Sequence, residues 1–521
     1  MLDLTYSGGT VGRLIADAVT RFSDRPALAD DHVRWTYSQL GDVIGRLLTL
    51  YRQLGLKPGD GICMVTGNRV EAWAATCASN VMGLRHTHLH PMSVEDDHAH
   101  ILQDSQATTL IVDSRKFAGL GQRLKARLPQ VQRLLSLGQV EGATDILARI
   151  EGLEAAPLVC PCDPEDTMLL TYTGGTTGKS KGIDMPHRAI VTMSSIIAAE
   201  WEWPQNLRYM AMTPISHSAG VKIYPVMSRG GYTRLVDGFD VESFCQIVAE
   251  EGISATFLVP TMLNAMLQRP KIVENYDLSS LGLIIYGAAP MAPDQMRRAI
   301  ESFGPVFLQL YGQSEAPECI TTMRVADHDL ARPDRLASCG RATMLCEVTL
   351  LDTGLNEVPD GTPGELCVRG PLVMNGYWGL PELTEEVFRG GWLHTGDVAW
   401  RDSDGYYYIV DRTKDMIISG GFNIYPREVE DTLAAHPAVD MAAVIGVPDA
   451  KWGEAVTAFV VLRDGKRITP EELMAHVKAE RGGPWAPKTI HFLDELPLTG
   501  LGKLDRKSLR KPYWEGRARD I

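Results

Sequence analysis

The chain has 521 residues, of which 45% are hydrophobic and 22% charged, and its formal net charge is −14. This length is too great for one hydrophobic core, so we expect at least two domains. An acidic chain is not expected to bind nucleic acid in general, and any phosphate site must be built from local cations and N–H groups. Nine cysteines without a repeated spacing predict reduced thiols and a cytoplasmic protein. No apolar run approaches the ~20 residues of a membrane helix, so no membrane span is expected.

The N-terminal part of the chain alternates helical and strand-like patterns. Apolar spacing predicts an amphipathic helix over residues 11–22 and a second helix over 71–82. Short apolar runs predict strands at 61–66 and 108–113. We expect residues 114–150 to be helical and solvated.

The stretch 171–182 has the composition of a phosphate-binding loop. It reads Thr-Tyr-Thr-Gly-Gly-Thr-Thr-Gly-Lys-Ser-Lys-Gly and follows an apolar run. Glycines let backbone N–H groups point inward, and lysines add positive charge. A Walker A motif is excluded because Thr173 stands where that pattern requires a glycine, five residues before Gly178. A flexible surface loop remains the alternative for this stretch alone.

Four further apolar or β-branched runs are each followed by a loop of small or polar residues. They lie at 209–213, 255–259, 281–286 and 306–310, with helix-length segments at 244–251 and 293–303. This alternation predicts parallel sheets with helices on their faces. Ligands of such sheets bind at the carboxyl ends of the strands, so we expect the loops to converge on one site.

The C-terminal third changes character twice. Turn sequences such as Pro359-Asp-Gly361 predict a β-rich subdomain between about 340 and 411. A compact αβ unit is expected beyond it, with helices at 426–435 and 470–480 and strands at 438–447 and 455–462. We therefore expect an N-terminal domain of residues 1–411 and a C-terminal domain of residues 412–521.

Five polar residues of these loops have both an ordinary and a chemical interpretation. Singly, Tyr311 is a core tyrosine, Glu315 a helix-start residue and His217 a structural histidine. Asp397 is likewise a turn cap, and Lys503 a surface lysine. In a nucleotide site, however, an aromatic ring packs on a base and carboxylates bind Mg²⁺ or ribose hydroxyls.

In their order, five motifs resemble the core motifs of the adenylate-forming superfamily. That family includes acyl-CoA synthetases, aryl-CoA ligases, adenylation domains of peptide synthetases and firefly luciferase. The motifs are the stretch 171–182, Tyr311-Gly-Gln-Ser-Glu315, His394-Thr-Gly-Asp397, Asp411-Arg-Thr-Lys-Asp-Met-Ile-Ile-Ser-Gly-Gly421 and Leu498-Thr-Gly-Leu-Gly-Lys503. The resemblance spans about residues 30–510. It implies an α/β fold: a large N-terminal domain of parallel-type βαβ sheets with a small β-rich subdomain, then a small mobile α+β C-terminal domain.

The resemblance implies an ATP site and assigns residues to it. The β- and γ-phosphates would be held by Thr173, Gly174, Gly175, Thr176, Thr177, Gly178 and Lys179, and adenine by Gly287, Ala288, Ala289, Pro290 and Tyr311. The α-phosphate would be held by Ser314 and ribose by Asp397 and Arg412, and Gly312 also belongs to the expected nucleotide site. Glu315 would bind Mg²⁺, and Lys503 would contact the carboxylate and the α-phosphate. Gly174 and Ser180 depart from the family pattern, which has Ser and Pro at these positions.

The resemblance also implies a CoA tunnel, an acyl pocket and a hinge. The tunnel would be lined by Ser419, Gly420, Gly421, Trp452 and Trp485, and the acyl pocket by His217, Tyr224, Val259, Gly287 and Gln313. Lys414 aligns with the family's hinge residue. His217 resembles the gate residue and completes the expected catalytic set with Lys503 and Glu315. Gln313 or Lys222 could meet a second polar group on the substrate, although we expect Lys222 to be solvated.

We therefore expect an AMP-forming carboxylic acid–CoA ligase that uses ATP, Mg²⁺ and CoA. The expected acid is medium-chain fatty, alicyclic or aromatic. An amino acid is less favoured, because Ser216-His217-Ser218-Ala219 stands where an amine-binding Asp is usual. Alternatives are an adenylation enzyme that loads a carrier protein, a luciferase-type oxygenase, or a silent family member that acts as a binding protein. A homodimer is left open.

Overall fold

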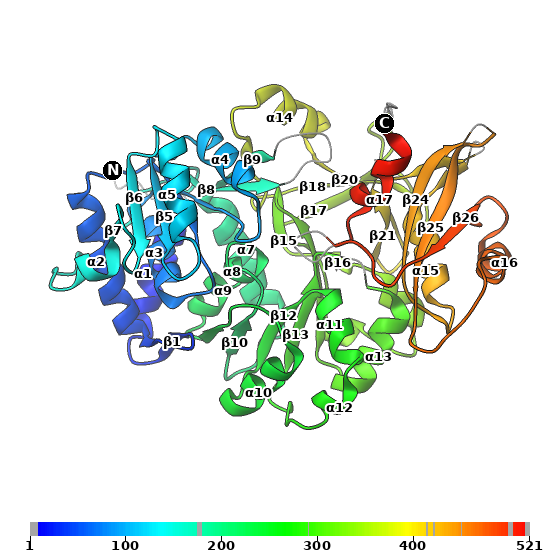
Figure 1. The fold of residues 1–521 in the computed structure, drawn as a ribbon, viewed down its shortest axis with the longest axis horizontal. Coiled ribbons are helices and arrows are strands. Elements are labelled where there is room, and N and C mark those ends of the chain that lie inside the picture. The colour runs from blue at the N-terminus through cyan, green and yellow to red at the C-terminus, as the bar shows by residue number, and fades with distance from the viewer. Residues whose placement is uncertain are drawn as a thin grey trace.

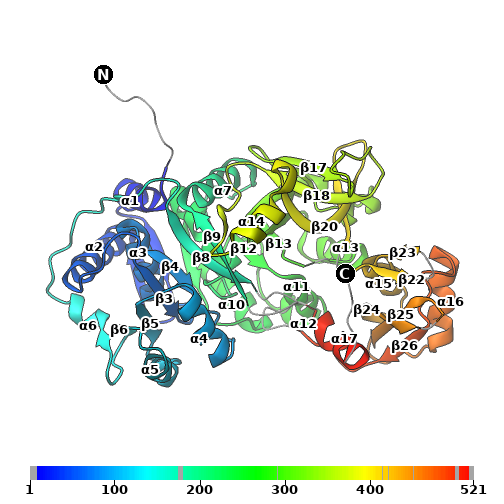
Figure 2. The same cartoon turned by 90° about the horizontal axis from the view of Figure 1, so that it is seen from above.

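The computed structural model describes residues 9–173, 180–289, 291–412, 415–419, 422–449, 451–498 and 504–515. A large N-terminal domain is built on two mainly parallel sheets, and a smaller C-terminal domain, orange to red in Figure 1, lies at one end of the molecule. Figure 2 shows the same division from above. The α/β fold expected from the sequence is confirmed.

One sheet of the N-terminal domain has eight strands in the order β19-β9-β8-β4-β3-β5-β6-β7. Its parallel strands are β3 (Gly61–Val65), β4 (Arg85–His88), β5 (Thr109–Asp113), β6 (Arg133–Leu137), β7 (Thr144–Asp145) and β8 (Thr167–Thr173), and β9 (Lys181–Pro186) and β19 (Gly376–Tyr377) run antiparallel at the edge. The expectation of a solvated helical stretch over 114–150 is wrong at β6. Its short Leu-rich run pairs with β5 and is buried, although flanking Arg and Lys residues mask it in the sequence.

The second sheet has nine strands in the order β16-β15-β14-β13-β12-β10-β11-β1-β2. They are β1 (Pro26–Ala29), β2 (Arg34–Thr36), β10 (Arg208–Ala211), β11 (Tyr232–Leu235), β12 (Ala255–Leu258), β13 (Leu283–Gly287), β14 (Phe307–Gln313), β15 (Ala316–Met323) and β16 (Arg341–Ala342). The four strands expected between 209 and 310 are all present, and they lie side by side in parallel. Their carboxyl ends therefore share one edge of the sheet.

Helices cover both sheets. They are α1 (Val11–Arg21), α2 (Tyr37–Gln53), α3 (Val70–Met82), α4 (Glu95–Asp104), α5 (Ala118–Arg127), α6 (Ile146–Ile150), α7 (His187–Glu200), α8 (Ser218–Val221), α9 (Ile223–Ser228), α10 (Val241–Glu251), α11 (Pro260–Leu267), α12 (Pro270–Val273), α13 (Pro293–Phe303) and α14 (Pro381–Val387), with short 3₁₀ turns η1 (Val325–Asp327), η2 (Pro333–Ala337) and η3 (Arg389–Gly391). Helix α1 begins at Thr10, whose hydroxyl accepts the Arg13 N–H, as a helix N-cap requires. Helix α3 is buried along its whole length, since it packs between its neighbours and the sheet. Within the described ranges, no helix has the length and apolarity to cross a membrane.

Two smaller sheets complete the chain. The β-rich subdomain is an antiparallel sheet of β17 (Glu347–Leu351), β18 (Gly364–Arg369), β20 (Leu393–Arg401) and β21 (Tyr407–Arg412). The C-terminal domain has β22 (Ile417–Ser419), β23 (Phe422–Ile424), β24 (Val439–Asp449), β25 (Gly453–Leu462) and β26 (Thr489–Phe492), with α15 (Pro426–Ala434), α16 (Pro470–Arg481) and α17 (Arg506–Trp514). The boundary at 411/412 stays a prediction.

Contacts between the two domains are polar. Arg427 on α15 donates to the Ile409 carbonyl at 3.1 Å, and Gln268 donates to Asp440 at 3.0 Å. Arg463 and Asp294 lie 3.8 Å apart. Interfaces of this kind resemble transient protein–protein contacts and permit relative domain motion.

Candidate active site

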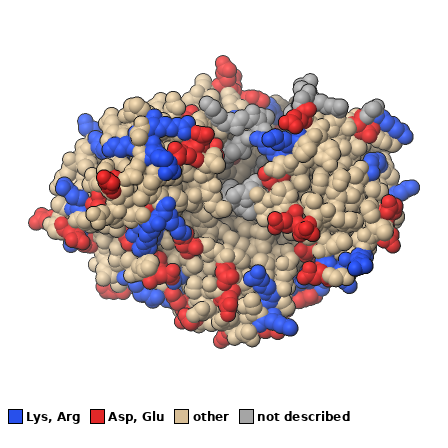
Figure 3. All heavy atoms as spheres, viewed as in Figure 1, with Lys and Arg blue, Asp and Glu red and all other residues tan. Residues whose placement is uncertain are grey.

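A cleft of about 2650 Å³ lies between the two domains. Its walls include residues from the loops after β10, β12, β13 and β14, from the strands β8 and β9, and from α15 and α17. In Figure 3 the surface is hollowed between the two parts of the molecule, and both signs of charge are interspersed on this face. Four of the five loops that the sequence singled out thus meet at one cleft. The fifth, after β8, lies outside the described residues, but the strands on either side of it, β8 and β9, line the cleft although they belong to the other sheet.

Glu315 occupies the turn of the β14–β15 hairpin. Its Oε1 accepts a hydrogen bond from the Tyr377 hydroxyl at 2.9 Å, and its carbonyl accepts the Met374 N–H at 2.9 Å. Burial and the nearby carboxylate raise the pKa of Tyr377. The half-buried carboxylate lines the cleft and offers the oxygen ligands that Mg²⁺ prefers. Tyr377, on a strand of the other sheet, was missed because its sequence context resembles an ordinary aromatic turn.

Tyr311 and Asp397 are joined directly. The Tyr311 hydroxyl donates to Asp397 Oδ2 at 2.6 Å. Burial, with Asp397 beside it, raises the pKa of Tyr311. Arg412 lies opposite Asp397 in the pairing of β20 with β21, and its side chain falls outside the described atoms. The structure thus brings together the expected adenine and ribose residues.

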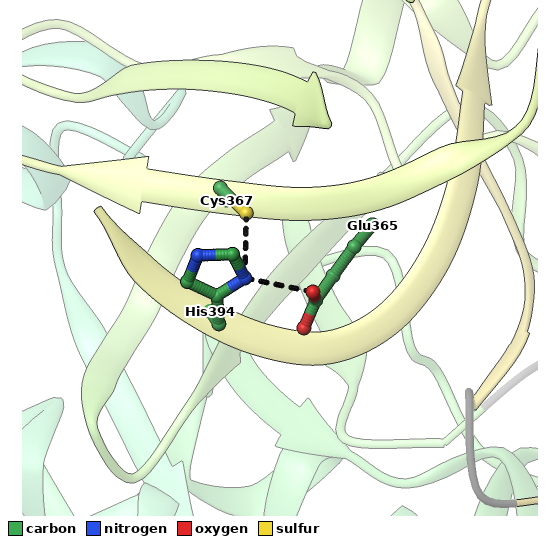
Figure 4. Close-up of side chains that lie close together, drawn as sticks. All are labelled: Glu365, Cys367 and His394. Carbon is green, nitrogen blue, oxygen red and sulfur yellow. Dashed lines mark hydrogen bonds and ion pairs between the residues drawn. The ribbon is translucent and has the colours of Figure 1, made fainter. Parts of the chain in front are cut away.

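A hydrogen-bonded turn sets the position of Asp397. His394 Nδ1 lies 2.7 Å from Glu365 Oε2 and 3.4 Å from Cys367 Sγ, as Figure 4 shows. Glu365 Oε1 also accepts the Gly396 N–H at 3.1 Å. One ring nitrogen faces both neighbours, and the ring's Nε2 faces the Arg389 carbonyl at 3.2 Å. We interpret this group as a hydrogen-bonded support for the turn and not as a metal site.

The loop that carries His217 is built around a glycine. A Cβ on Gly220 would lie 1.9 Å from the Ile215 carbonyl oxygen, and the Gly220 N–H donates to the His217 carbonyl. His217 Nδ1 lies 2.8 Å from Ser216 Oγ. Its ring makes an edge-on contact with His90, whose centroid is 4.7 Å away. Burial lowers the pKa of His90, and the Met92 N–H donates to its Nδ1.

The loop after β13 approaches its neighbours closely. A Cβ on Gly287 would lie 2.5 Å from the Leu310 carbonyl oxygen, which explains a glycine at this strand end. Ala288 has a left-handed backbone, with φ of 64°. Ala288 and Ala289 line the cleft, whereas Gly287 does not.

Several expected site residues lie wholly or partly outside the described residues. They are Gly174, Gly175, Thr176, Thr177, Gly178, Lys179, Pro290, Lys414, Gly420, Gly421 and Lys503, and of Thr173 only the backbone is described. Near Lys503, Leu498 and Leu504 form a β-bridge and both line the cleft. Chain on both sides of the expected catalytic lysine therefore faces the cleft.

The described members of the expected CoA set, Ser419, Trp452 and Trp485, lie on the C-terminal domain and do not line the cleft. Ser419 pairs with Gly453, the neighbour of Trp452. The ammonium groups of Lys451 and Lys488 lie 4.7 and 5.5 Å from the Trp452 ring centroid. Trp485 donates to Glu428 at 2.9 Å.

The expected acyl-pocket residues divide into two groups. His217, Val259 and Gln313 line the cleft beside Gly312 and Ser314. Tyr224 does not: its ring packs against Trp73, 5.1 Å between centroids, and its hydroxyl accepts from Asn80. Tyr224 lies on the face of α9 that packs into the core, so its side chain does not form a wall of the acyl pocket.

The expectation of a solvated Lys222 is wrong. The side chain is fully buried and forms an ion pair with Glu318. Burial lowers the pKa of this lysine, while Glu318 opposes the shift. No local pattern in the sequence indicates this pair, because Lys222 and Glu318 lie on separate elements.

Comparison with known proteins places this architecture in a family. Residues 15–378 match the profile of the AMP-binding enzyme family, and residues 428–503 match its C-terminal domain. The chain is 44% identical to the medium/long-chain-fatty-acid–CoA ligase FadD8 of Mycobacterium tuberculosis, over 98% of this chain and 91% of that protein. It is 35% identical to feruloyl-CoA synthase of Amycolatopsis sp, over 92% and 94% of the two chains.

Solved structures share the whole fold. The amide bond synthetase McbA of Marinactinospora thermotolerans is 30% identical, with a TM-score of 0.89 over 96% of this chain and 99% of that one. ATP-bound MatB of Rhodopseudomonas palustris is 26% identical, with a TM-score of 0.88 over 97% and 99%. This chain belongs to the AMP-binding enzyme family of the adenylate-forming superfamily, and it is an enzyme of the AMP-forming acyl-CoA ligase type.

Proposed function

We propose that the enzyme activates a medium-chain fatty, alicyclic or aromatic acid in the cleft and transfers it to CoA. The observation that carries the proposal is the convergence of four strand-end loops, with the strands β8 and β9, on one cleft between the domains. Two of the relatives, named for a fatty-acid ligase and a feruloyl-CoA synthase, support this range of acids.

In the first half-reaction a carboxylate oxygen attacks the α-phosphorus of ATP, the bond to pyrophosphate breaks, and an acyl-adenylate forms. Two anions approach each other, so the site must supply positive charge where it accumulates. We assign Lys503 to the reacting oxygens and Glu315, oriented by Tyr377, to Mg²⁺. Mg²⁺, when bound, neutralises charge on the phosphates.

In the second half-reaction the CoA sulfur attacks the adenylate carbonyl, the bond to AMP breaks, and a thioester forms. The expected CoA residues that the structure describes do not line the cleft, and the described contacts between the domains include polar pairs that can separate. We propose that the C-terminal domain rotates about Lys414 between the half-reactions, moving Lys503 away and bringing Ser419 and Trp452 to the cleft. Lys451 and Lys488, beside Trp452, would meet the phosphates of CoA.

The test is a panel of carboxylic acids assayed for ATP–pyrophosphate exchange and for acceptor-dependent AMP release. We expect exchange with some of the acids, and AMP release that requires CoA. Release that depends on a carrier protein, or on an amine as in an amide bond synthetase, would contradict CoA as the acceptor. Exchange with none of the acids would contradict the proposed range.

A further inference from the structure

A buried ion pair stands behind the wall of the cleft, at the side that carries His217. Lys222, at the junction of α8 and α9, has no exposed surface, and Glu318 on β15 is 8% exposed. The ammonium donates to Glu318 Oε2, to Ser218 Oγ at 2.6 Å and to the Ser218 carbonyl at 3.2 Å. It also lies 3.9 Å from the ring centroid of Phe257. All three ammonium protons therefore have acceptors.

The backbone at Glu318 is held in an unfavourable conformation. Its φ of 67° is in the left-handed region, which residues other than glycine, asparagine and aspartate rarely occupy. The neighbouring strand fits closely, since a Cβ on Gly312 would lie 2.5 Å from the Glu318 nitrogen. Strain of this kind persists where the surroundings fix the residue, and it is frequent at ligand sites.

Glu318 lines the cleft, and only one of its two carboxylate oxygens is engaged by Lys222. Glu318, Ser218, Val221 and Phe257 all line the cleft, and Ser218 follows the expected gate residue His217. Lys222 donates to Oε2, and no hydrogen bond from the described part of the chain reaches Oε1. The wall therefore presents a hydrogen-bond acceptor next to the expected position of the acyl group.

The charges determine which group this acceptor suits. An apolar acyl chain that covers a carboxylate oxygen removes it from water without a replacement hydrogen bond, which is unfavourable. The Lys222–Glu318 pair has no net charge, so it would not neutralise an ammonium group on a substrate. A neutral O–H donor replaces the lost water contact without adding charge.

We propose that Glu318, held by Lys222, is a specificity-determining residue that selects acids with a hydroxyl group on the acyl part, such as hydroxyaryl or hydroxyalkyl acids. The inference rests on the proposed function and narrows its range of acids. It also explains the buried lysine, because the ammonium group of Lys222 fixes the orientation of the Glu318 carboxylate.

The first test compares acids that differ by one hydroxyl group. Suitable pairs are 3-phenylpropanoic and 3-(4-hydroxyphenyl)propanoic acid, cinnamic and 4-hydroxycinnamic acid, and decanoic and 10-hydroxydecanoic acid, with the 3-hydroxy isomers of the ring compounds to place the donor. A hydrogen bond to a charged group corresponds to a preference of about 10- to 100-fold in kcat/KM for the hydroxylated member of at least one pair. Equal rates within every pair, or a preference for the unsubstituted acids, would overturn the proposal. Exchange with no acid at all would instead contradict the proposed function.

The second test removes both charges together. A single substitution would leave the other charge buried without a partner, so we choose the double variant Lys222→Met/Glu318→Leu, which keeps similar volumes. We expect it to lose the preference for the hydroxylated acid, mainly through KM, while it still activates the unsubstituted member. Retention of the wild-type preference by the double variant would contradict the proposal. If that double variant does not fold, Lys222→Gln/Glu318→Gln also removes both charges; a smaller preference is expected, and an unchanged one would count against the proposal.

Discussion

Tyr377 and Glu315 are a coupled pair that spans the two sheets of the N-terminal domain. The tyrosine hydroxyl holds Glu315 Oε1 at 2.9 Å and so limits where a Mg²⁺ ligand can point. A carboxylate that must find its orientation at every turnover binds a cation less well than one that is already placed. The residue expected to bind Mg²⁺ and the residue that orients it thus come from different sheets.

Tyr377→Phe should weaken the response to Mg²⁺ without abolishing catalysis. Loss of one hydrogen bond to a charged group corresponds to about a tenfold rise in the Mg²⁺ concentration for half-maximal pyrophosphate exchange. Tyr408→Phe is the matched control, because its hydroxyl also donates to a carboxylate, Asp402, but Tyr408 does not line the cleft. An unchanged Mg²⁺ titration in Tyr377→Phe would contradict this role.

The segment around α8 depends on close backbone approach more than on side-chain packing. Gly220 lets the chain fold back on Ile215, and this return places His217 at the cleft. His90, from the end of β4, then packs edge-on against the His217 ring. The position of His217 therefore depends on two elements from different sheets.

Gly220→Ala should displace the His217 loop. The added Cβ would overlap the Ile215 carbonyl oxygen, and relief of such an overlap costs about 1 to 3 kcal/mol of stability. We expect a lower melting temperature and at least a tenfold rise in KM for the acid, with KM for ATP less affected, since the loop lies at the acyl side. Gly483→Ala is the control, because a Cβ there meets no atom within 4 Å. Equal effects of the two substitutions would argue against a special role for Gly220.

The two-domain arrangement predicts that adenylate formation depends on Lys503 and that thioester formation does not. In Lys503→Ala the charge that serves adenylate formation is absent, and one such group is typically worth a factor of ~100 to 1,000 in rate. Thioester formation from a supplied acyl-adenylate should stay near the wild-type rate, because the lysine has left the site by then. Lys57→Ala, at an exposed position, is the control. An equal loss of rate in both half-reactions would contradict a role of Lys503 in adenylate formation alone.

Acid should destabilise the folded chain through buried neutral histidines. Burial lowers the pKa of His88, His187 and His328 to about 4, against 6.5 for an unperturbed histidine. Above pH 6.5 these rings are neutral in both the folded and the unfolded state, so they do not lower the free energy of unfolding. As the pH falls from 6.5 toward 4 the unfolded state binds protons first, so each histidine costs about 1 to 2 kcal/mol by pH 5.

Denaturant unfolding between pH 7 and 4 measures this loss. In His328→Gln the unfolding free energy should depend less steeply on pH than in the wild type, by an amount that corresponds to about one bound proton. An unchanged slope would show that His328 is not buried in its neutral form.

Much of the architecture was predictable, because strand and helix periods are local properties of the sequence. The strands at 209–213, 255–259, 281–286 and 306–310 were expected and found, since each apolar run ends in a recognisable turn. The strand β6 was missed, because its burial comes from pairing with β5 and not from its own pattern. Which sheet a strand joins, as with β8, is likewise a long-range property.

By itself the sequence determined the family, the α/β class and the order of the site motifs, because these depend on short stretches of residues with characteristic chemistry. Only the tertiary structure decided which residues face the cleft. It turned Tyr224 into the core, buried Lys222 against Glu318, and placed Tyr377 beside Glu315. The physical reason is that contacts between residues 60 to 150 positions apart depend on strand pairing and helix packing, which leave no local pattern in the sequence.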